Sequence, residues 1–318
     1  MPSRPLDRRL FLASLAACAT AAPASAMVVQ LNDPLSDLVL PPPYVPPANM
    51  NAVMDMHSRM SAPVRVNGTG PYPFVVDTGS NQSVIADTLA AELGLERGPL
   101  ELVNGIVGAE SAPTTTATLA FGSRTETDVV LSILPRAAVG AVGMLGVDRL
   151  AGQRLTLNFV DTRLSIEDAR HARRDPADIV MAAHPRDGQL TLVDASLAGA
   201  PVIAFLDSGA ERTIGNLALR DRVTQKRAAL LWAEVPVVSA TGQTIVAQVG
   251  DLPELRIGGL RLPHWPVAFA SLHTFELWGA ADRPALIVGV DVLSRFASVA
   301  LDFFRSEVRF RTSDSLSV

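Results

Sequence analysis

The sequence predicts a mainly β protein built from two related lobes, and three observations support this fold class. The 318 residues include 23 prolines and 22 glycines with only 5% aromatic residues, which is typical of many short strands and turns rather than a helical bundle. Short apolar runs recur between turn signals. A series of landmarks in the first half returns in the same order in the second, which chance matches rarely do. We expect two related lobes, one from each half of the chain.

The composition describes a globular chain and excludes several classes of function. Apolar residues make up 48% of the sequence and charged residues 19%, and the net charge of -5 has no basic block behind it, so we expect no nucleic-acid partner. Cys18 is the only cysteine and the five histidines are scattered, so we expect no disulfide, no metal and no cofactor in the folded part. No run reaches the roughly 18 apolar residues of a transmembrane helix.

The first 26 residues are expected to be an export signal that leads to the periplasm. Arg8 and Arg9 precede a short apolar run, and residues 24–26 form the small-x-small pattern of a signal peptidase site, as in twin-arginine signals. A second processing route stays open at Cys18, because residues 15–18 resemble the lipobox of bacterial lipoproteins. On that route Cys18 would carry a lipid anchor.

The rest of the chain divides by composition and by the internal repeat. A proline-rich stretch favours an extended spacer before the first lobe, and a segment with several arginines separates the two lobes. The expected boundaries are 1–26 for the signal, 27–52 for the proline-rich arm, 53–167 for the first lobe, 168–188 for a linker, 189–312 for the second lobe and 313–318 for a C-terminal tail.

The first lobe is expected to begin with a hairpin that delivers a carboxylate. Residues 64–66 alternate apolar and polar side chains, residues 67–68 are a tight-turn signal, and the apolar run 74–76 ends at Asp77. The glycine two residues after Asp77 permits a sharp turn there.

A short helix is expected to follow over residues 88–93, with Asp87 as its N-cap and Gly94 as its stop. The remaining elements of this half are a glycine-bearing hairpin and short strands. They are expected at residues 103–108 for the hairpin, 116–121, 129–134, 155–159 and 163–166 for strands, and 144–150 for an apolar run containing Gly146.

The second half repeats this order. Asp207 stands where Asp77 stands, Asn216 is expected to cap the helix that follows, and residues 239–243 take the hairpin position. The other matching landmarks, first copy then second, are residues 67–68 and 198–199, 121–122 and 257–258, 144–150 and 287–293, and 157–159 and 301–303.

The two repeated aspartates suit hydrolysis of an amide. This reaction needs a base that takes a proton from water and an acid that protonates the carbonyl oxygen and the leaving nitrogen. Two carboxylates about 3 Å apart cannot both ionise easily, so they share one proton and titrate as a unit. Asp77 and Asp207 are therefore the candidate catalytic residues.

The motifs Asp77-Thr-Gly-Ser and Asp207-Ser-Gly-Ala, each followed downstream by an apolar-apolar-Gly segment, resemble the two active-site halves of the aspartic peptidases. The short halves resemble the retropepsin-like branch, with both copies in one chain, and the resemblance covers residues from about 53 to 312. It implies a bilobal acid-protease fold, with two β-barrel-like lobes related by a pseudo-twofold axis, and a peptide or protein substrate. Because both aspartates are in one chain, we expect a monomer. It also assigns support of the active-site loops to Thr78, Gly79, Ser80, Ser208, Gly209, Gly146 and Gly289.

Within this resemblance the two glycine-bearing hairpins are candidate flaps that close over a peptide. The residues concerned are Gly105 and Gly108 in the first hairpin and Thr241 and Gly242 in the second. Neither hairpin contains a tyrosine, which departs from pepsin-like enzymes, and an ordinary surface hairpin is the alternative for either.

Two further expectations concern activity. Ser80 could donate a hydrogen bond to ionised Asp77 whereas Ala210 offers Asp207 none, so Asp207 is expected to hold the shared proton. The main function expected is that of an aspartic endopeptidase. The alternative is a periplasmic peptide-binding module that has this fold without turnover, since fold does not guarantee activity.

Overall fold

The computed structural model describes residues 47–55, 58–148, 150, 152–186, 189–225 and 232–312, all within one compact unit, Val45–Val318. The predicted signal, Cys18, most of the proline-rich arm and the C-terminal tail lie outside the described residues. The strands of the first half are β1 (Ala48–Asn51), β2 (Val53–Met54), β3 (Met60–Val66), β4 (Thr69–Val76), β5 (Val84–Ala86), β6 (Leu100–Asn104), β7 (Ala109–Phe121), β8 (Arg124–Leu134), β9 (Gly143–Leu145), β10 (Gln153–Asn158) and β11 (Arg163–Asp168).

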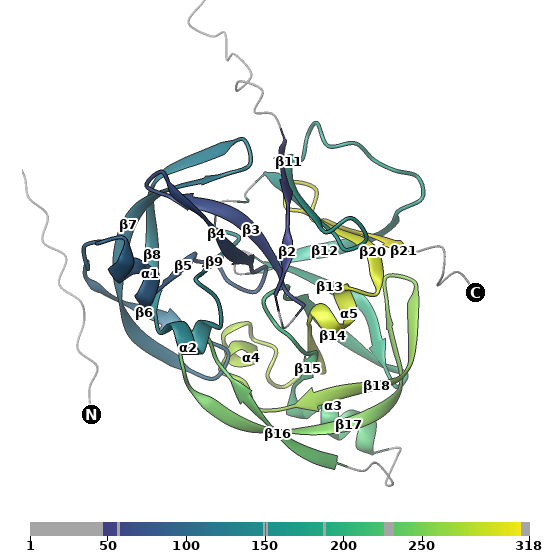
Figure 1. Cartoon of the computed structure of the whole chain (residues 1–318). Helices are drawn as coiled ribbons and strands as arrows, with labels where there is room; N and C mark the ends of the chain where they lie inside the picture. The colour runs from purple at the N-terminus through teal and green to yellow at the C-terminus, as the bar shows by residue number, and fades with distance from the viewer. Residues whose placement is uncertain are drawn as a thin grey trace, which may run out of the picture. The chain divides into compact units, whose positions relative to one another are not determined.

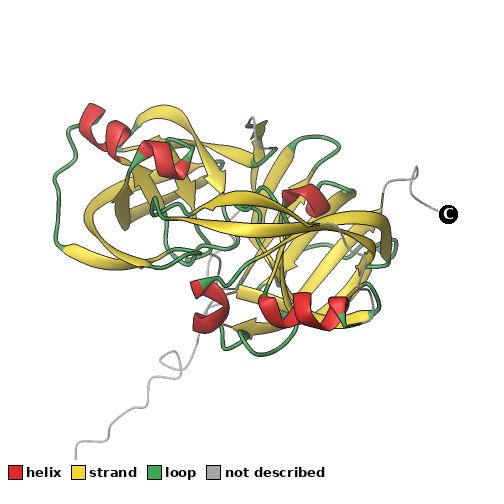
Figure 2. Ribbon diagram, turned by 90° about the horizontal axis from the view of Figure 1, so that it is seen from below, coloured by secondary structure: helices red, strands yellow, loops and turns green. Residues whose placement is uncertain are grey.

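The second half follows the same plan, and the helices of both halves are short. Its strands are β12 (Ile179–Arg186), β13 (Gln189–Leu197), β14 (Ala200–Leu206), β15 (Ile214–Gly215), β16 (Trp232–Val238), β17 (Thr244–Ile257), β18 (Leu260–Phe269), β19 (Ala285–Val288), β20 (Phe296–Asp302) and β21 (Glu307–Thr312). The helices, drawn in red in Figure 2, are α1 (Asp87–Glu92), α2 (Arg136–Val139), α3 (Leu217–Thr224), α4 (His273–Leu277) and α5 (Val290–Leu293).

Two sheets hold the strands, and the predicted fold class is confirmed: the protein is mainly β and has two barrel-like lobes (Figure 1). The first lobe is an eight-stranded sheet in the order β2-β3-β4-β9-β5-β8-β7-β6, with β3 also paired to β7. The second lobe is the part of a 13-stranded sheet that runs β13-β14-β19-β15-β18-β17-β16, with β13 also paired to β17. The additional pairing curls each sheet back on itself, which buries one of its faces.

The other strands of the larger sheet join the two halves. They run β1-β11-β10-β20-β21-β12, and β10 of the first half pairs antiparallel with β20 of the second, Leu155 opposite Leu301. Phe159 and Phe303 pack against the cores of both lobes at this seam. The seam therefore fixes one lobe against the other.

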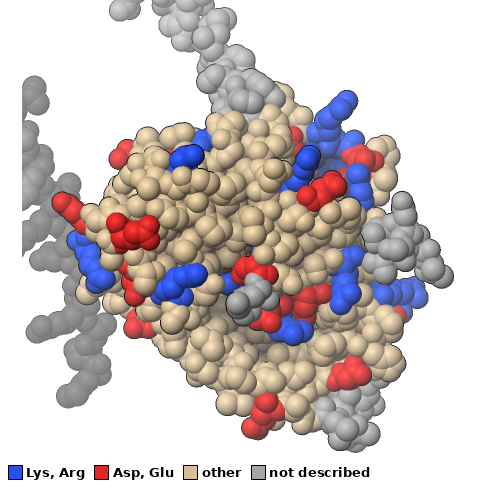
Figure 3. Space-filling view, in the orientation of Figure 1, with Lys and Arg blue, Asp and Glu red and all other residues tan. Residues whose placement is uncertain are grey.

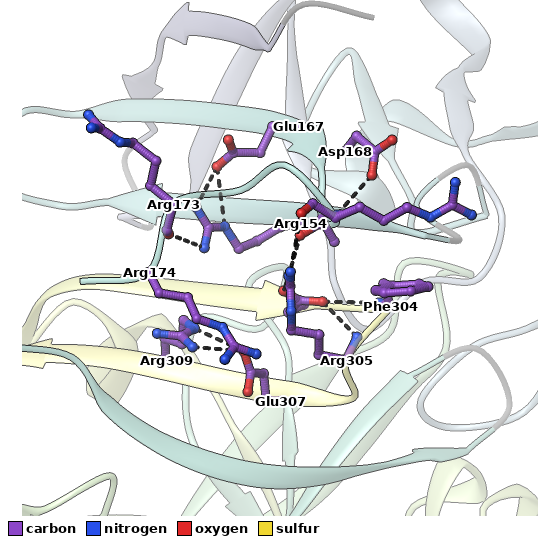
Figure 4. Close-up of polar contacts among 12 residues, drawn as sticks. Arg154, Glu167, Asp168, Arg173, Arg174, Phe304, Arg305, Glu307 and Arg309 are labelled. Atoms are coloured by element: carbon purple, nitrogen blue, oxygen red, sulfur yellow. Dashed lines mark hydrogen bonds and ion pairs between the residues drawn. The ribbon is translucent and has the colours of Figure 1, made fainter. Parts of the chain in front are cut away.

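Charged side chains at this seam add ion pairs (Figure 4). The Arg154 guanidinium lies 2.7 Å from the Glu167 carboxylate, and Arg305 lies 2.8 Å from Asp302, which is fully buried. Arg305 also donates to the carbonyl oxygen of Ala169, which ties the β20–β21 turn to the segment after β11. Because these partners are buried or half-buried, they resist separation more than surface ion pairs do.

Strands also form in the segments predicted to be an arm and a linker. β1 falls inside the predicted arm and pairs with β11, and β12 falls inside the predicted linker and pairs with β21. Both are stabilised by partners distant in sequence, so local residue pattern did not reveal them.

The predicted helix caps have different outcomes. Asn216 accepts a hydrogen bond from the Leu219 N–H and caps α3, as predicted. The prediction for Asp87 is wrong by one position, because α1 begins at Asp87 and its cap residue Ala86 makes no side-chain bond. The Asp87 carboxylate instead accepts from the N–H groups of Thr88 and Arg136, which joins α1 to α2.

The described residues show neither a helix that could span a bilayer nor a metal-ligand cluster. Every helix among them is too short or too polar for a membrane span, and they contain no group of three acidic, histidine or cysteine side chains that could hold a metal ion. On the face drawn in Figure 3, basic and acidic side chains are interspersed in small groups across a largely uncharged surface.

Candidate active site

The two candidate carboxylates lie at equivalent positions of the two lobes. Asp77 follows β4 and Asp207 follows β14, and each of these strands runs parallel to a short partner, β9 or β19. The Asp77 N–H donates to the Leu145 carbonyl at 2.9 Å and the Asp207 N–H donates to the Val288 carbonyl at 3.0 Å. Both aspartates are buried, with 6% and 7% of their surface exposed.

The glycines after the aspartates let the two turns meet face to face. A Cβ atom at Gly79 would lie 2.4 Å from Cγ of Asp207, and one at Gly209 would lie 2.4 Å from Cγ of Asp77. Any side chain there would overlap the opposite carboxylate. The structure therefore brings Asp77 and Asp207 together, each against the backbone of the other's turn.

The hydroxyls of Thr78 and Ser208 join the turns by reciprocal hydrogen bonds. Thr78 Oγ1 donates to the Leu206 carbonyl at 2.8 Å and accepts from the Ser208 N–H at 3.0 Å. Ser208 Oγ donates to the Val76 carbonyl at 2.7 Å and accepts from the Thr78 N–H at 3.1 Å. Each hydroxyl is buried and satisfied as both donor and acceptor, so this set of four bonds holds the turns in register.

Gly146 and Gly289 lie beneath the two turns. A Cβ atom at Gly146 would lie 2.9 Å from the Ser80 carbonyl oxygen, and one at Gly289 would lie 2.8 Å from the Ala210 carbonyl oxygen. Both contacts are with backbone, which cannot move aside as a flexible side chain can. Glycine is required at both positions by this close approach.

Asp148 and Asp291, which follow these glycines by two residues, hold the same loops from below. Ser83 donates to Asp148 at 3.0 Å and Thr213 donates to Asp291 at 2.7 Å. Burial raises the pKa of Asp291, and the hydrogen bonds from Thr213 oppose that rise. These carboxylates brace the turns and do not face the Asp77–Asp207 pair.

Burial dominates the electrostatics of the aspartate pair. It raises the pKa of both carboxyl groups, and for Asp77 the negative charge of Asp207 raises the pKa further. The Gly79 N–H donates to Asp77 at 2.8 Å, whereas Asp207 Oδ1 accepts two N–H groups, from Gly209 at 2.9 Å and Ala210 at 3.0 Å. The additional donor favours the ionised form at Asp207, so the pair's shared proton resides mainly on Asp77.

This arrangement corrects the expectation that Asp207 holds the proton. Ser80 Oγ donates to the Gln82 carbonyl at 2.6 Å and so is not available to stabilise ionised Asp77. Ala210, which has no side-chain donor, supplies its backbone N–H to Asp207 instead. Backbone N–H donors therefore outweigh the difference between the side chains of Ser80 and Ala210.

The two glycine-bearing hairpins meet at their tips. In the β6–β7 hairpin the Gly105 N–H donates to the Gly108 carbonyl at 2.8 Å, and a Cβ atom at Gly105 would lie 2.3 Å from Thr241 Oγ1 of the β16–β17 hairpin. A Cβ atom at Gly108 would lie 3.6 Å from Gln243, in ordinary contact. The four candidate flap residues are thus near one another.

Each tip also contacts the opposite lobe. The Thr274 N–H of α4 donates to the Ile106 carbonyl of the first hairpin at 3.5 Å. A Cβ atom at Gly242 of the second hairpin would lie 3.8 Å from Cβ of Ala138 in α2, and Ala240 packs against the apolar cluster of the first lobe. The hairpins therefore bridge the lobes in a closed arrangement.

Arg59 is a residue near the site that sequence reasoning missed. It is 8% exposed, and its positive charge lowers the pKa of both Asp77 and Asp207 against the effect of burial. The strand register carried a signal for it. Arg59 comes one residue before β3, and Asp77 comes one residue after β4, the strand paired with β3. That register became visible only with the pairing of β3 and β4.

The comparison with known families agrees with this geometry. A model of the aspartyl protease family matches residues 62–149 and 193–292, together more than half of the chain. Each matched region lies in one lobe and contains one of the two aspartates. The chain belongs to the aspartyl protease family. A search among curated proteins found no match.

Proposed function

We propose that this protein is an aspartic endopeptidase that hydrolyses peptide bonds with one water molecule activated by Asp77 and Asp207. The observation that carries the proposal is the contact between the two buried carboxylates, each packed against the glycine of the other's turn. Such a pair offers a base and an acid at once, because it holds one proton between two carboxylates.

In this mechanism the ionised carboxylate takes a proton from water as the water oxygen attacks the carbonyl carbon of the substrate. The protonated carboxyl group gives its proton to the carbonyl oxygen, which forms a tetrahedral diol. Asp207 then gives its proton to the amide nitrogen while one hydroxyl of the diol gives its proton to Asp77. The C–N bond breaks, the carboxylic acid and the amine are released, and the pair again holds one proton. Asp207 is the base at the start of the cycle because its two backbone donors favour the ionised form.

An extended peptide is the substrate class that suits two hairpins over a carboxylate pair. A peptide of this kind pairs with exposed strand edges through its backbone, and alternate side chains enter pockets. The aspartates are buried while the hairpin tips touch. The hairpins must therefore separate to admit substrate.

The test compares the protein lacking residues 1–26 with its Asp77→Asn and Asp207→Asn variants on a mixed peptide library over a range of pH. Both variants are expected to cleave about 100-fold to 10,000-fold more slowly than the parent, which is the range for loss of general acid–base catalysis. Asp251→Asn, at an exposed carboxylate of β17, is the matched control and is expected to retain activity. Undiminished cleavage by either active-site variant would contradict the proposal.

The second candidate function is peptide binding without turnover, in which the two hairpins would hold an extended peptide that the aspartates do not cleave. The same samples discriminate it. A folded parent protein that binds library peptides at every pH and cleaves none would establish the binding module.

The proposal includes export and a monomeric state. Residues 1–26 would direct export to the periplasm, with either a cut after Ala26 or lipidation at Cys18, and the mass of the mature N-terminal peptide distinguishes the two routes. One chain carries both aspartates, so a second subunit is not needed to complete the pair. Light scattering of the active sample tests the monomer.

A further inference from the structure

Strand register places a single arginine beside the aspartate pair. In the pairing of β3 with β4, Ser61 lies opposite Val75. Two more residues along each strand in that register bring Arg59 opposite Asp77. Arg59 is therefore positioned by the same sheet that delivers the carboxylate.

The Arg59 side chain is buried and held from two directions. Its Nε donates to Asp55 Oδ2 at 2.8 Å, and its backbone N–H donates to Asp55 Oδ1 at 2.9 Å. Its terminal nitrogens make longer bonds of 3.5 and 3.4 Å to the carbonyl oxygens of Val139 and Gly140, at the end of α2. The Asp55 carboxylate offsets part of the guanidinium's field and the two neutral carbonyls do not, and the remaining field still lowers the pKa of both aspartates.

The charge of Arg59 reaches both members of the pair although the arginine belongs to the first lobe. It lowers the pKa of Asp77 in its own lobe and the pKa of Asp207 in the other. The two turns are therefore joined by matching hydrogen bonds, while the cation that acts on both carboxylates comes from one side.

We propose that Arg59 is a positioning residue for the proposed hydrolysis: it keeps one of the two buried carboxylates ionised over the working pH range. The inference rests on the proposed function and deepens it. Among the charged groups of the described residues, the cation that acts on both carboxylates is Arg59, and Asp55 pairs with the Nε of Arg59. Asp148 and Asp291 are turned to hydroxyls beneath the loops.

Arg59 opposes the effect of burial. Without a nearby cation, two carboxylates in a dry site would both tend to hold protons, and the base would be lost at acidic to neutral pH. The pKa of both Asp77 and Asp207 is lowered by Arg59. The acid limb of the rate profile should therefore lie at lower pH with the arginine than without it.

A purely structural role makes a different prediction. Arg59 also binds the end of α2, and α2 contacts the β16–β17 hairpin through Ala138 and Gly242. If this were all that Arg59 did, its removal would lower the rate equally at every pH. The pH profile separates the two roles.

The experiment measures kcat/KM against pH for the parent, Arg59→Met, Arg59→Lys and Asp55→Asn. Arg59→Met removes the charge and is expected to move both limbs of the profile to higher pH, and Arg59→Lys is expected to restore the parent profile. Asp55→Asn leaves the guanidinium without its counter-charge and is expected to move both limbs to lower pH. Arg65→Met, at an exposed arginine of β3, is the matched control and should leave the profile in place.

Opposite shifts for Arg59→Met and Asp55→Asn would support the inference, since disruption of the fold cannot move the limbs in opposite directions. Unmoved limbs, or shifts in the same direction, would overturn it. Should Arg59→Met fail to fold, the Asp55→Asn shift alone decides.

A second readout separates failure of the inference from failure of the proposed function. The pH dependence of Tm reports the protonation of the pair whether or not the protein cleaves peptides. If the parent is inactive, the proposed function fails, and the shift of the Tm profile between parent and Asp55→Asn still tests Arg59. If the parent is active and both profiles are unmoved, only the inference fails.

Discussion

The two lobes join their active-site turns by matching hydrogen bonds, but they differ in the backbone donors and in the charge that they bring to the carboxylates. Thr78 and Ser208 make matching pairs of bonds across the interface, and Gly146 and Gly289 make matching contacts beneath the turns. The surroundings of the carboxylates differ, because Asp207 accepts two backbone N–H groups and Asp77 accepts one, and because Arg59, the cation that acts on both, belongs to the first lobe.

This difference shows that the interface constrains the geometry of the turns more than the charge around them. The backbone and hydroxyl contacts are reciprocal, so a change in one lobe must be matched in the other. The cation is not reciprocal: one positive charge near a pair that shares one proton acts on both members wherever it is placed. Two copies can therefore diverge in charge while they keep the same turn geometry.

The largest expected effect tests whether the turns after Asp77 and Asp207 are equivalent. Gly79→Ala and Gly209→Ala would each push a methyl group into the opposite carboxylate, since a Cβ atom would lie 2.4 Å from its Cγ. We expect both variants to lose about 100-fold in kcat/KM, the typical cost of misplacing a catalytic group by about 1 Å. Thermal unfolding of each variant is the control for folding. A large loss in one variant and none in the other would break the symmetry of the site.

The next effect concerns stability against pH. The pKa of both aspartates is raised by burial, so the folded state binds more protons than the unfolded chain above about pH 4, and stability falls as pH rises toward the raised pKa. Asp77→Asn and Asp207→Asn should each remove this loss and stabilise the protein at neutral pH by roughly 1–4 kcal/mol. The gain in the free energy of unfolding should be larger for Asp77→Asn than for Asp207→Asn, and it should become smaller toward pH 4. Urea unfolding at several pH values measures it, and a gain independent of pH would contradict the cause.

The cross-lobe hydroxyls should be equivalent in energy. Thr78→Val and Ser208→Ala each leave a buried carbonyl and a buried N–H without a partner, at a cost of about 1–3 kcal/mol. The double variant should cost less than the two single losses added together, because the bonds share one small interface. Thr116→Val, at an exposed threonine of β7, is the control in the same denaturation experiment. Strictly additive losses would show that the two turns do not act together.

The smallest effect tests the position that differs most plainly in sequence. Ser80→Ala removes the hydroxyl that donates to the Gln82 carbonyl, and should cost about 0.5–1.5 kcal/mol of stability. The pH–rate profile should not move, because this hydroxyl does not reach Asp77. An upward shift of the acid limb would restore the interpretation drawn from side chains alone.

The repeat, the aspartates and the mainly β class could be predicted from the sequence because they depend on local pattern. Apolar runs that end in Asp-x-Gly specify a strand and a sharp turn wherever they occur, and two of them in matching order predict two related lobes. The cap at Asn216 is local in the same sense, since its side chain bonds a backbone N–H only three residues away.

The tertiary structure alone decided the features that depend on distant partners. Strands β1 and β12 exist because β11 and β21 pair with them, and the hairpin tips meet because each reaches the opposite lobe. The placement of the shared proton depends on backbone N–H groups, which only the fold directs at a carboxylate. The role proposed for Arg59 depends on strand register. Residue type determined which groups could carry the chemistry, and the packing of the two lobes decided which of them lie close enough to interact.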